Sequence, residues 1–230
     1  MIDYKIYSVI LCFFSIIFIG CESKKPMEDL VIHRFENEFY NSNEQNLKLL
    51  VKKYPYLFPE QYPMETWKSF LKDSTRLSIY DTSSRIFDNF EPISKEILEI
   101  FLKLETIFPE FKRPKIITLN SQSEYENRVI YADSLLFISL DSYLGKSFYP
   151  ELPEYISLNM SKEYISNDVA EKMSQNFIYK PNDRSLLAEM IYHGKILFLN
   201  KYLTPFNENH IKFHSDLSKI NCAEENEYNI

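Results

Sequence analysis

The sequence predicts a single α+β domain, mostly helical, with a small sheet packed by helices. Hydrophobic residues make up 45% of the 230-residue chain and aromatic residues 16%, which is enough for a sizeable core. Apolar residues recur at helical spacing over 92–108 and 185–202. Between these two segments lie short β-branched runs bounded by Pro, Asn or Asp, which are typical of strands.

The predicted elements follow one another in a simple order. Residues 31–39 are compatible with a strand or an extended arm, and helices are predicted over 43–53, 66–71, 73–90 and 92–108. Asp73 is the expected N-cap of the third helix and Ser94 of the fourth. Strands are predicted over 114–120, 128–132 and 134–141. Further helices follow over 161–177, over 185–202 with Asp183 or Ser185 as its cap, and from residue 215 to the end.

The first twenty-one residues are typical of a lipoprotein signal. An apolar run over 6–20 ends at Gly20-Cys21, and polar residues follow at once. A run of this length suits a signal-peptide core and is short for a membrane-spanning helix, although an uncleaved N-terminal membrane helix is the alternative. We expect cleavage before Cys21 and acylation of its thiol, each buried CH2 contributing roughly 0.8 kcal/mol to anchoring. The expected organisation is a signal peptide over 1–20, a tether over 21–30 and one domain over 31–230.

Composition excludes several classes of function. The net charge of −7 without a basic stripe argues against nucleic-acid binding. Only three glycines occur, so a glycine-rich phosphate loop is absent, and no cofactor is expected.

The cysteines leave little room for disulfides or thiol chemistry. Once Cys12 is removed with the signal and Cys21 is lipidated, Cys222 has no disulfide partner within the chain. A Cys222 nucleophile would need His210 or His214 beside it. A half-buried packing role is the favoured interpretation of Cys222.

Glu189 and His193 are the first candidates for chemistry. Their i, i+4 spacing places them on one side of the predicted helix, where they form either an ordinary helix pair or two ligands of a metal. The zinc-peptidase pattern HExxH would read Ala188-Glu189-Met190-Ile191-Tyr192 here, so the Glu is kept and both His positions are lost. Asp141, His214 or Glu227 would have to complete a metal site.

The segment LDSYLG over 140–145 is a second candidate. Asp141 ends a strongly apolar strand and Gly145 follows shortly after, which is a common arrangement at functional loops. An ordinary turn explains the same residues, since Asp and Gly both suit turn backbones.

The order of several blocks resembles the gliding motility lipoprotein GldB family of Bacteroidota. The resemblance extends over essentially the whole chain and is carried by Cys21 followed by these blocks: HRFENEF (33–39), KKYPYLFP (52–59), IFPEFKRPKIITL (107–119), LLFISLDSYLG (135–145), LLAEMIYHGKILF (186–198) and NCAEENEYNI (221–230). The LD-YLG and MIY-GK blocks are the most specific, and they single out Asp141, Gly145, Glu189, Gly194 and Lys195.

The resemblance implies a lipid-anchored envelope component needed for gliding and for the linked protein secretion system, with other machinery proteins as partners. It also implies a remote relation to zinc-peptidase-like domains, hence a degenerate zincin-like scaffold without its ligands. Members similar to this chain continue past the ENE segment, so the sequence is expected to be a C-terminally shortened form.

Three hypotheses follow from the sequence. The leading one is a membrane-anchored lipoprotein that acts by protein contact and is not an enzyme. The second is a metal-binding or hydrolytic envelope protein that uses Glu189 and His193. The third is a shortened relative without a role in motility.

Overall fold

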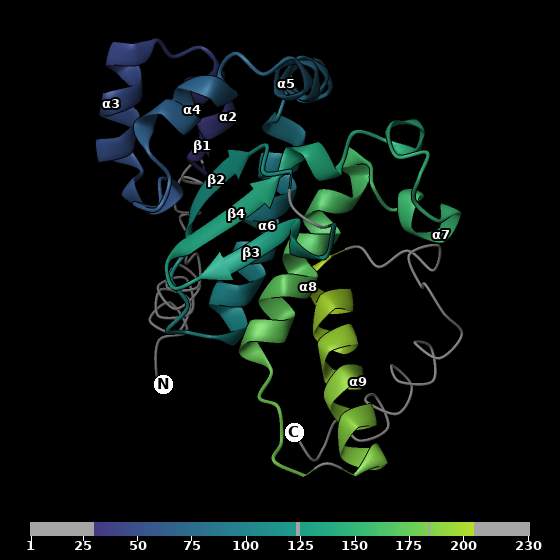
Figure 1. Ribbon diagram of the computed structural model, residues 1–230. Helices are drawn as coiled ribbons and strands as arrows, with labels where there is room; N and C mark the ends of the chain where they lie inside the picture. The colour runs from purple at the N-terminus through teal and green to yellow at the C-terminus, as the bar shows by residue number, and fades with distance from the viewer. Residues whose placement is uncertain (1–29, 123–124, 184, 205–230) are drawn as a thin grey trace, which may run out of the picture.

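A four-stranded mixed sheet lies between two groups of helices. The computed structural model describes residues 30–122, 125–183 and 185–204. The strand order is β1-β2-β4-β3, with β1 at Ile32–Arg34, β2 at Lys115–Leu119, β4 at Leu135–Ser139 and β3 at Val129–Ala132 (Figure 1). The first three strands are parallel, and β3 pairs antiparallel with β4.

Helices account for most of the described chain. Before β2 the chain forms α2 (Phe35–Tyr40), α3 (Glu44–Lys53), the 3-10 turn η1 (Pro55–Leu57), α4 (Met64–Phe70), α5 (Ser74–Ile86) and α6 (Glu91–Ile107). The turn η2 (Tyr125–Asn127) precedes β3. After β4 come η3 (Leu140–Ser142), η4 (Lys146–Phe148), α7 (Glu154–Ser157), η5 (Lys162–Tyr164), α8 (Ile165–Phe177) and α9 (Leu186–Leu203).

The prediction of a mostly helical chain with a small, helix-flanked sheet is confirmed. The sheet has a fourth strand beside the three predicted over 114–141, because Ile32–Arg34, in the segment predicted as a strand or an extended arm, pairs with β2 before the chain turns into α2. The helix predicted from residue 215 onward lies outside the described residues. Within the described part of the chain, no helix is both long and apolar enough to cross a membrane.

Side-chain caps fix the start of several helices. The Asp73 carboxylate accepts a hydrogen bond from the Arg76 amide at 2.8 Å, and the Ser185 hydroxyl oxygen accepts one from the Ala188 amide at 3.2 Å, as predicted. Ser94 is not the cap of α6. That helix begins three residues earlier, at Glu91, because Pro92 has a backbone suited to the first turn.

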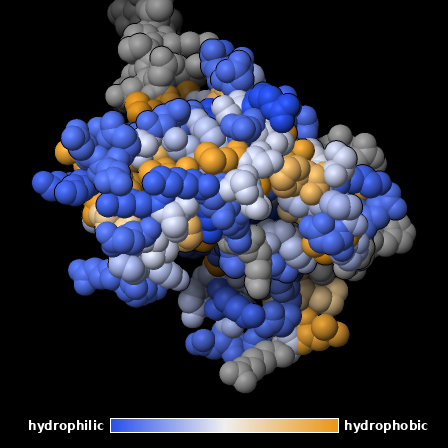
Figure 2. Space-filling model, turned by 45° about the horizontal axis from the view of Figure 1, so that its top comes forward, coloured by the Kyte–Doolittle hydropathy of each residue, from blue (hydrophilic) through white to orange (hydrophobic). Residues whose placement is uncertain are grey.

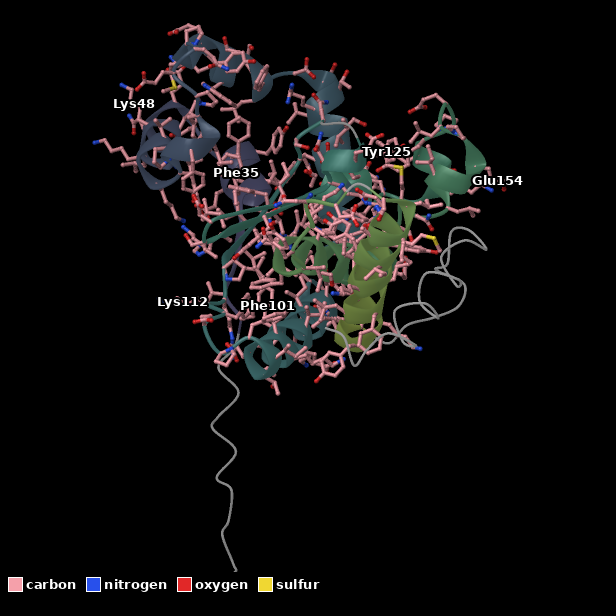
Figure 3. All side chains as sticks on the ribbon, turned by 90° about the horizontal axis from the view of Figure 1, so that it is seen from below. Phe35, Lys48, Phe101, Lys112, Tyr125 and Glu154 are labelled. Atoms are coloured by element: carbon pink, nitrogen blue, oxygen red, sulfur yellow. The ribbon has the colours of Figure 1, made fainter. Side chains whose placement is uncertain are left out.

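The two faces of the sheet bury separate clusters. Alternating residues of β2 and β4 point to opposite sides, so Ile116, Leu136 and Ile138 pack with α6, α8 and α9, while Ile117 packs with α2, α3 and η1. Phe35 and Phe101 lie on opposite sides of the sheet (Figure 3). Parallel strands are normally covered on both faces in this way, which explains their continuous apolar sequences.

The role of the cluster around Ile117, which packs with α2, α3 and η1, is testable with two leucines of α3. Leu47 is fully buried in it, whereas Leu49 on the same helix is 63% exposed. Leu47→Ala is expected to lower the free energy of unfolding by about 2–5 kcal/mol, because it removes buried methyl groups and leaves a cavity. Leu49→Ala is the matched control and should change it by less than about 0.5 kcal/mol. Urea denaturation followed by circular dichroism measures both, and equal effects would contradict the assignment of this core.

Candidate functional site

The LDSYLG segment connects the carboxyl end of β4 to three other parts of the fold. The Asp141 carboxylate accepts hydrogen bonds from the backbone amides of Ser121 and Gln122, at 3.1 and 2.6 Å, in the segment that follows β2. Burial raises the pKa of this carboxyl above its usual value, while the amides of Gln122 and Ser121 favour the charged form and oppose that rise. Asp141 therefore ties the ends of two neighbouring strands together.

Tyr143 is hydrogen-bonded to the buried ion pair of Arg128 and Asp168. Its ring is almost fully buried, and its hydroxyl donates to Asp168 Oδ2 at 2.7 Å. Arg128 reaches the same carboxylate with two nitrogens, Nε at 2.7 Å and Nη2 at 2.8 Å. Burial, and then the charge of Asp168, raise the pKa of Tyr143 well above its usual value, so the hydroxyl keeps its proton and serves as a donor.

The ion pair joins elements that are distant in sequence. Arg128 immediately precedes the edge strand β3, Tyr143 follows η3, and Asp168 lies in the first turn of α8. Arg128 also donates from Nη1 to the carbonyl of Asn159 at 3.2 Å. Because each charge is mostly removed from water, removing one partner would leave the other buried without compensation.

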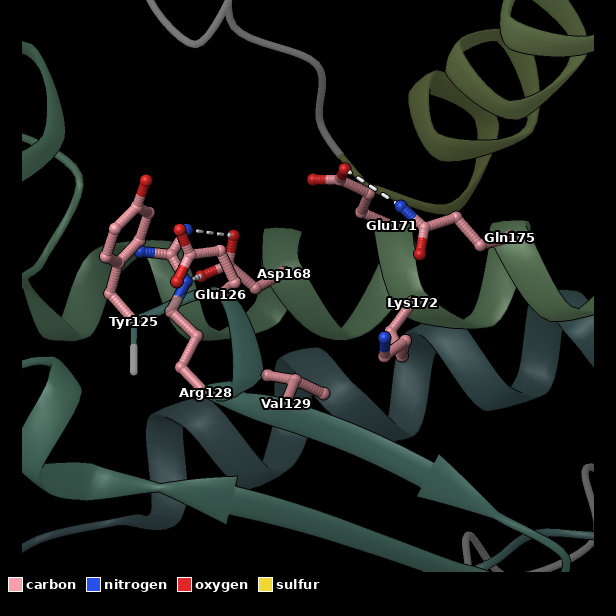
Figure 4. A pocket seen from close by; sticks show the side chains of 8 residues that line it. All are labelled: Tyr125, Glu126, Arg128, Val129, Asp168, Glu171, Lys172 and Gln175. Carbon is pink, nitrogen blue, oxygen red and sulfur yellow. Dashed lines mark hydrogen bonds and ion pairs between the residues drawn. The ribbon is translucent and has the colours of Figure 1, made fainter. Parts of the chain in front are cut away.

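Beside this ion pair lies a polar hollow between β3 and α8. Its volume is about 240 Å³, and its wall residues are Tyr125, Glu126, Arg128, Val129, Asp168, Glu171, Lys172 and Gln175. Figure 4 shows Arg128 and Asp168 at one end of this hollow, with Glu171 and Gln175 bonded to each other farther along α8.

A larger hollow lies on the other side of η2. It has a volume of about 640 Å³ and is lined by Ile79, Gln122, Tyr125, Glu126, Asp141, Ser142, Phe148, Tyr149, Glu151, Leu152 and Met160. Tyr125 and Glu126 line both hollows, so η2 forms a wall between them. This one lies outside the carboxyl ends of β2 and β4, which is where open α/β sheets usually bind ligands.

Gly145 has a backbone that other residues adopt only with strain. Its φ is +96°, and its amide donates to the Met160 carbonyl at 2.7 Å. A Cβ at this position would meet no atom within 4 Å, so the requirement for glycine is conformational and not steric. The turn interpretation of Asp141 and Gly145 fits this backbone. A functional role of the segment stays a prediction, and Asp141 lines the larger hollow.

Glu189 and His193 lie together near the start of α9. The distance from Glu189 Oε2 to His193 Nε2 is 3.7 Å, and Glu189 Oε1 is 3.2 Å from Lys180 Nζ. Lys180 is the partner that the sequence did not reveal, because it lies in the segment before the helix. Within the described residues no group of three His, Cys, Asp or Glu side chains is placed to hold a metal, and the Asp141 carboxylate is bonded to amides of the β2 end.

Two of the remaining candidate residues lie on α9, and the others lie outside the described residues. Gly194 is buried within α9, and Lys195 is half-buried on the same helix. Cys21, His210, His214, Cys222 and Glu227 lie outside the described residues.

Sequence reasoning missed Arg128, Asp168 and Tyr143 as a unit. One signal was available for Asp168: it lies between Ile165 and Val169 on the apolar face of the helix predicted over 161–177. A carboxylate in that position needs a buried partner. No local pattern identified Arg128 as that partner, since 40 residues separate the two.

The model of the family described as gliding motility protein GldB matches residues 22–230 of the chain. The chain belongs to this family. No curated protein and no solved structure matches it significantly.

Two of the blocks that carry the resemblance contribute buried, hydrogen-bonded side chains. HRFENEF contributes Glu36, which is buried between Arg34 and the Thr118 hydroxyl, the latter donating to Glu36 Oε2 at 2.7 Å. LDSYLG contributes Asp141 and Tyr143. Both blocks therefore hold loops to the carboxyl ends of the parallel strands.

The buried ion pair predicts that a substitution of one atom group in Asp168 strongly lowers the stability of the fold. Asp168→Asn should lower the free energy of unfolding by about 3–5 kcal/mol, because Arg128 stays buried without an opposite charge. The control is Glu105→Gln. This change breaks the partly exposed pair in which Arg113 donates two hydrogen bonds to Glu105, and it should lower the free energy of unfolding by less than about 1 kcal/mol. Chemical denaturation of the two variants gives the comparison, and a loss at Asp168 no larger than that at Glu105 would refute the structural role.

Proposed function

We propose that the protein is a lipid-anchored component of the gliding motility and associated secretion machinery, acting by protein–protein contact and without catalysis. The observation that carries this proposal is the family match, which begins at residue 22, directly after Cys21. The signal pattern and the match thus support the same mature chain, held to a membrane of the cell envelope by lipid on Cys21.

The bonding of the charged residues that line the two hollows supports a contact role. Arg128 and Asp168 satisfy each other, and the Asp141 carboxylate is held by two amides. A general acid or base has to be free to exchange a proton with a substrate. These groups instead hold loops in place, so they support rigid surfaces for a partner.

We also propose that the domain is a peptidase-like scaffold that has lost its metal ligands. The replacement of both His positions of HExxH by Ala188 and Tyr192 supports this relation. Glu189, the residue kept from that pattern, takes part in an ion pair with Lys180 near the surface.

The lipid anchor is tested by Cys21→Ser. In a gliding host that lacks its own GldB-family protein, the unchanged gene should restore gliding and Cys21→Ser should not, because one thiol carries the anchor. Metabolic labelling with a fatty-acid analogue should mark the parent protein and not the variant. Cys222→Ser serves as the matched control and should retain both label and gliding. Failure of the unchanged, labelled protein to restore gliding would favour the hypothesis of a relative without a motility role.

The metal-binding alternative has its own test. In it Glu189 is a ligand or general base and His193 a ligand, and the 3.7 Å approach of the two side chains is the observation in its favour. A third ligand would have to come from residues beyond the described part, such as His214 or Glu227. Elemental mass spectrometry of the dialysed protein should find no stoichiometric zinc. About one zinc per chain, lost in a Glu189→Ala, His193→Ala variant, would replace the contact proposal with the hydrolase alternative.

A further inference from the structure

The most exposed apolar side chains gather at one end of the domain. Five large hydrophobic residues of the described chain are at least 60% exposed: Val31 (68%), Leu49 (63%), Tyr179 (77%), Leu186 (78%) and Leu187 (60%). Apart from Leu49, Val31 directly precedes β1, Tyr179 lies on the connection between α8 and α9, and Leu186 and Leu187 are the first two residues of α9. On the face that Figure 2 shows, hydrophilic residues predominate, with smaller hydrophobic areas among them.

The geometry of the sheet places these residues at the same end. Because β1 is parallel to β2, β1 begins at the edge where α6 has just ended. The ring of Phe108, directly after α6, stacks on that of Phe177, the last residue of α8, with the centroids 4.8 Å apart. The connection from α8 to α9 therefore leaves from the edge at which the described chain begins, and the first turns of α9 extend beyond the sheet (Figure 1).

The protruding end is held together by its own contacts. We define the α8–α9 tip as Tyr179, Lys180, Leu186 and Leu187. Lys180 pairs with Glu189 at 3.2 Å and lies over the ring of Tyr192, 5.4 Å from its centroid. The tip therefore presents two leucines and a tyrosine while its lysine is already neutralised by a carboxylate.

The Asp183 carboxylate at the tip is also engaged. It accepts hydrogen bonds from the amide and the hydroxyl of Ser185, both at 2.8 Å. These bonds replace part of its hydration, and they hold the start of α9 so that Leu186 and Leu187 point away from any partner within the described chain.

The length of the tether limits how far this end can lie from the proposed anchor. Leu30, the first described residue, is nine positions after Cys21, and nine extended residues reach at most about 30 Å. With lipid on Cys21, the amino-terminal edge of the sheet stays within that distance of the bilayer. Tyr and Lys beside exposed leucines are the composition that favours the boundary between headgroups and acyl chains.

We propose that Tyr179, Leu186 and Leu187 enter the interface of the bilayer that holds the Cys21 anchor. The domain then contacts the membrane at two points, the lipid and the α8–α9 tip. The larger hollow, at the carboxyl ends of β2 and β4, then faces away from the membrane toward partner proteins. This inference rests on the proposed lipid anchor.

The test uses the full lipoprotein in phosphatidylcholine vesicles with or without bromine on the acyl chains. Bromine quenches only tryptophan close to it, and Trp67 gives the baseline that is measured in the parent and subtracted. Leu186→Trp should lose about half or more of its added emission in brominated vesicles, since interfacial side chains reach roughly 5–10 Å into the headgroup boundary. Leu49→Trp is the matched control on α3, where Leu49 is 63% exposed against 78% for Leu186, and it should lose none.

A second variant tests whether the contact with the membrane comes from the native side chains of the tip or from the introduced tryptophan alone. Adding Leu187→Glu to Leu186→Trp should abolish the quenching, because a charged side chain opposes insertion. Retained quenching in this double variant would mean that the tryptophan alone seeks the interface, and it would overturn the proposal. Unquenched emission of Leu186→Trp in protein bound to brominated vesicles would also overturn the proposal. This holds as well if crosslinking at position 186 joins two copies of the chain.

Vesicle flotation separates failure of the tip from failure of the anchor. Protein that does not float with the vesicles contradicts the lipid anchor of the proposed function. In that case a Cys12→Ser, Cys222→Ser chain coupled through Cys21 to a maleimide lipid carries the same tryptophans. Its quenching then supports or overturns the tip proposal by the same criteria.

Discussion

The fold depends on one buried ion pair, in which Arg128 and Tyr143 share the carboxylate of Asp168. It bonds the edge strand of the sheet, the loop after β4 and the first turn of α8 at a single point. Such a pair stabilises little relative to an apolar core, since both charges lose hydration. Its geometry is strict, however, because the planar guanidinium donates two parallel hydrogen bonds to the carboxylate in one orientation only. The pair therefore specifies where α8 crosses the edge of the sheet.

The position of α8 in turn decides what the surface presents. Asp168, Glu171, Lys172 and Gln175 along its length line the polar hollow beside β3, and its last residue, Phe177, packs against Phe108. One helix thus connects a polar end, where loops meet the carboxyl ends of the strands, to an apolar end that begins near the tether. With the proposed lipid on Cys21, these two ends would have different neighbours.

The two sequence blocks that carry most of the resemblance have different structural roles. The LDSYLG block gives Asp141 to the β2 end, Tyr143 to the ion pair and Gly145 to a left-handed turn. The MIYHGK block gives a buried glycine and a surface pair to α9. The first block organises the domain across long sequence distances, whereas the second acts mainly within its own helix and with the segment just before it.

The sequence by itself determined most of the secondary structure, the lipid-anchor pattern and the family, because helical spacing, β-branched runs and capping residues act over a few neighbours. It predicted α6, α8, α9 and three strands, and it recognised Asp141 and Gly145 as unusual. Only the tertiary structure decided that 32–34 pairs with β2, that Lys180 is the partner of Glu189 and that Arg128 meets Asp168 40 residues away. These contacts depend on which face each element buries when the chain collapses, and a buried charge finds its partner across that space and not along the sequence.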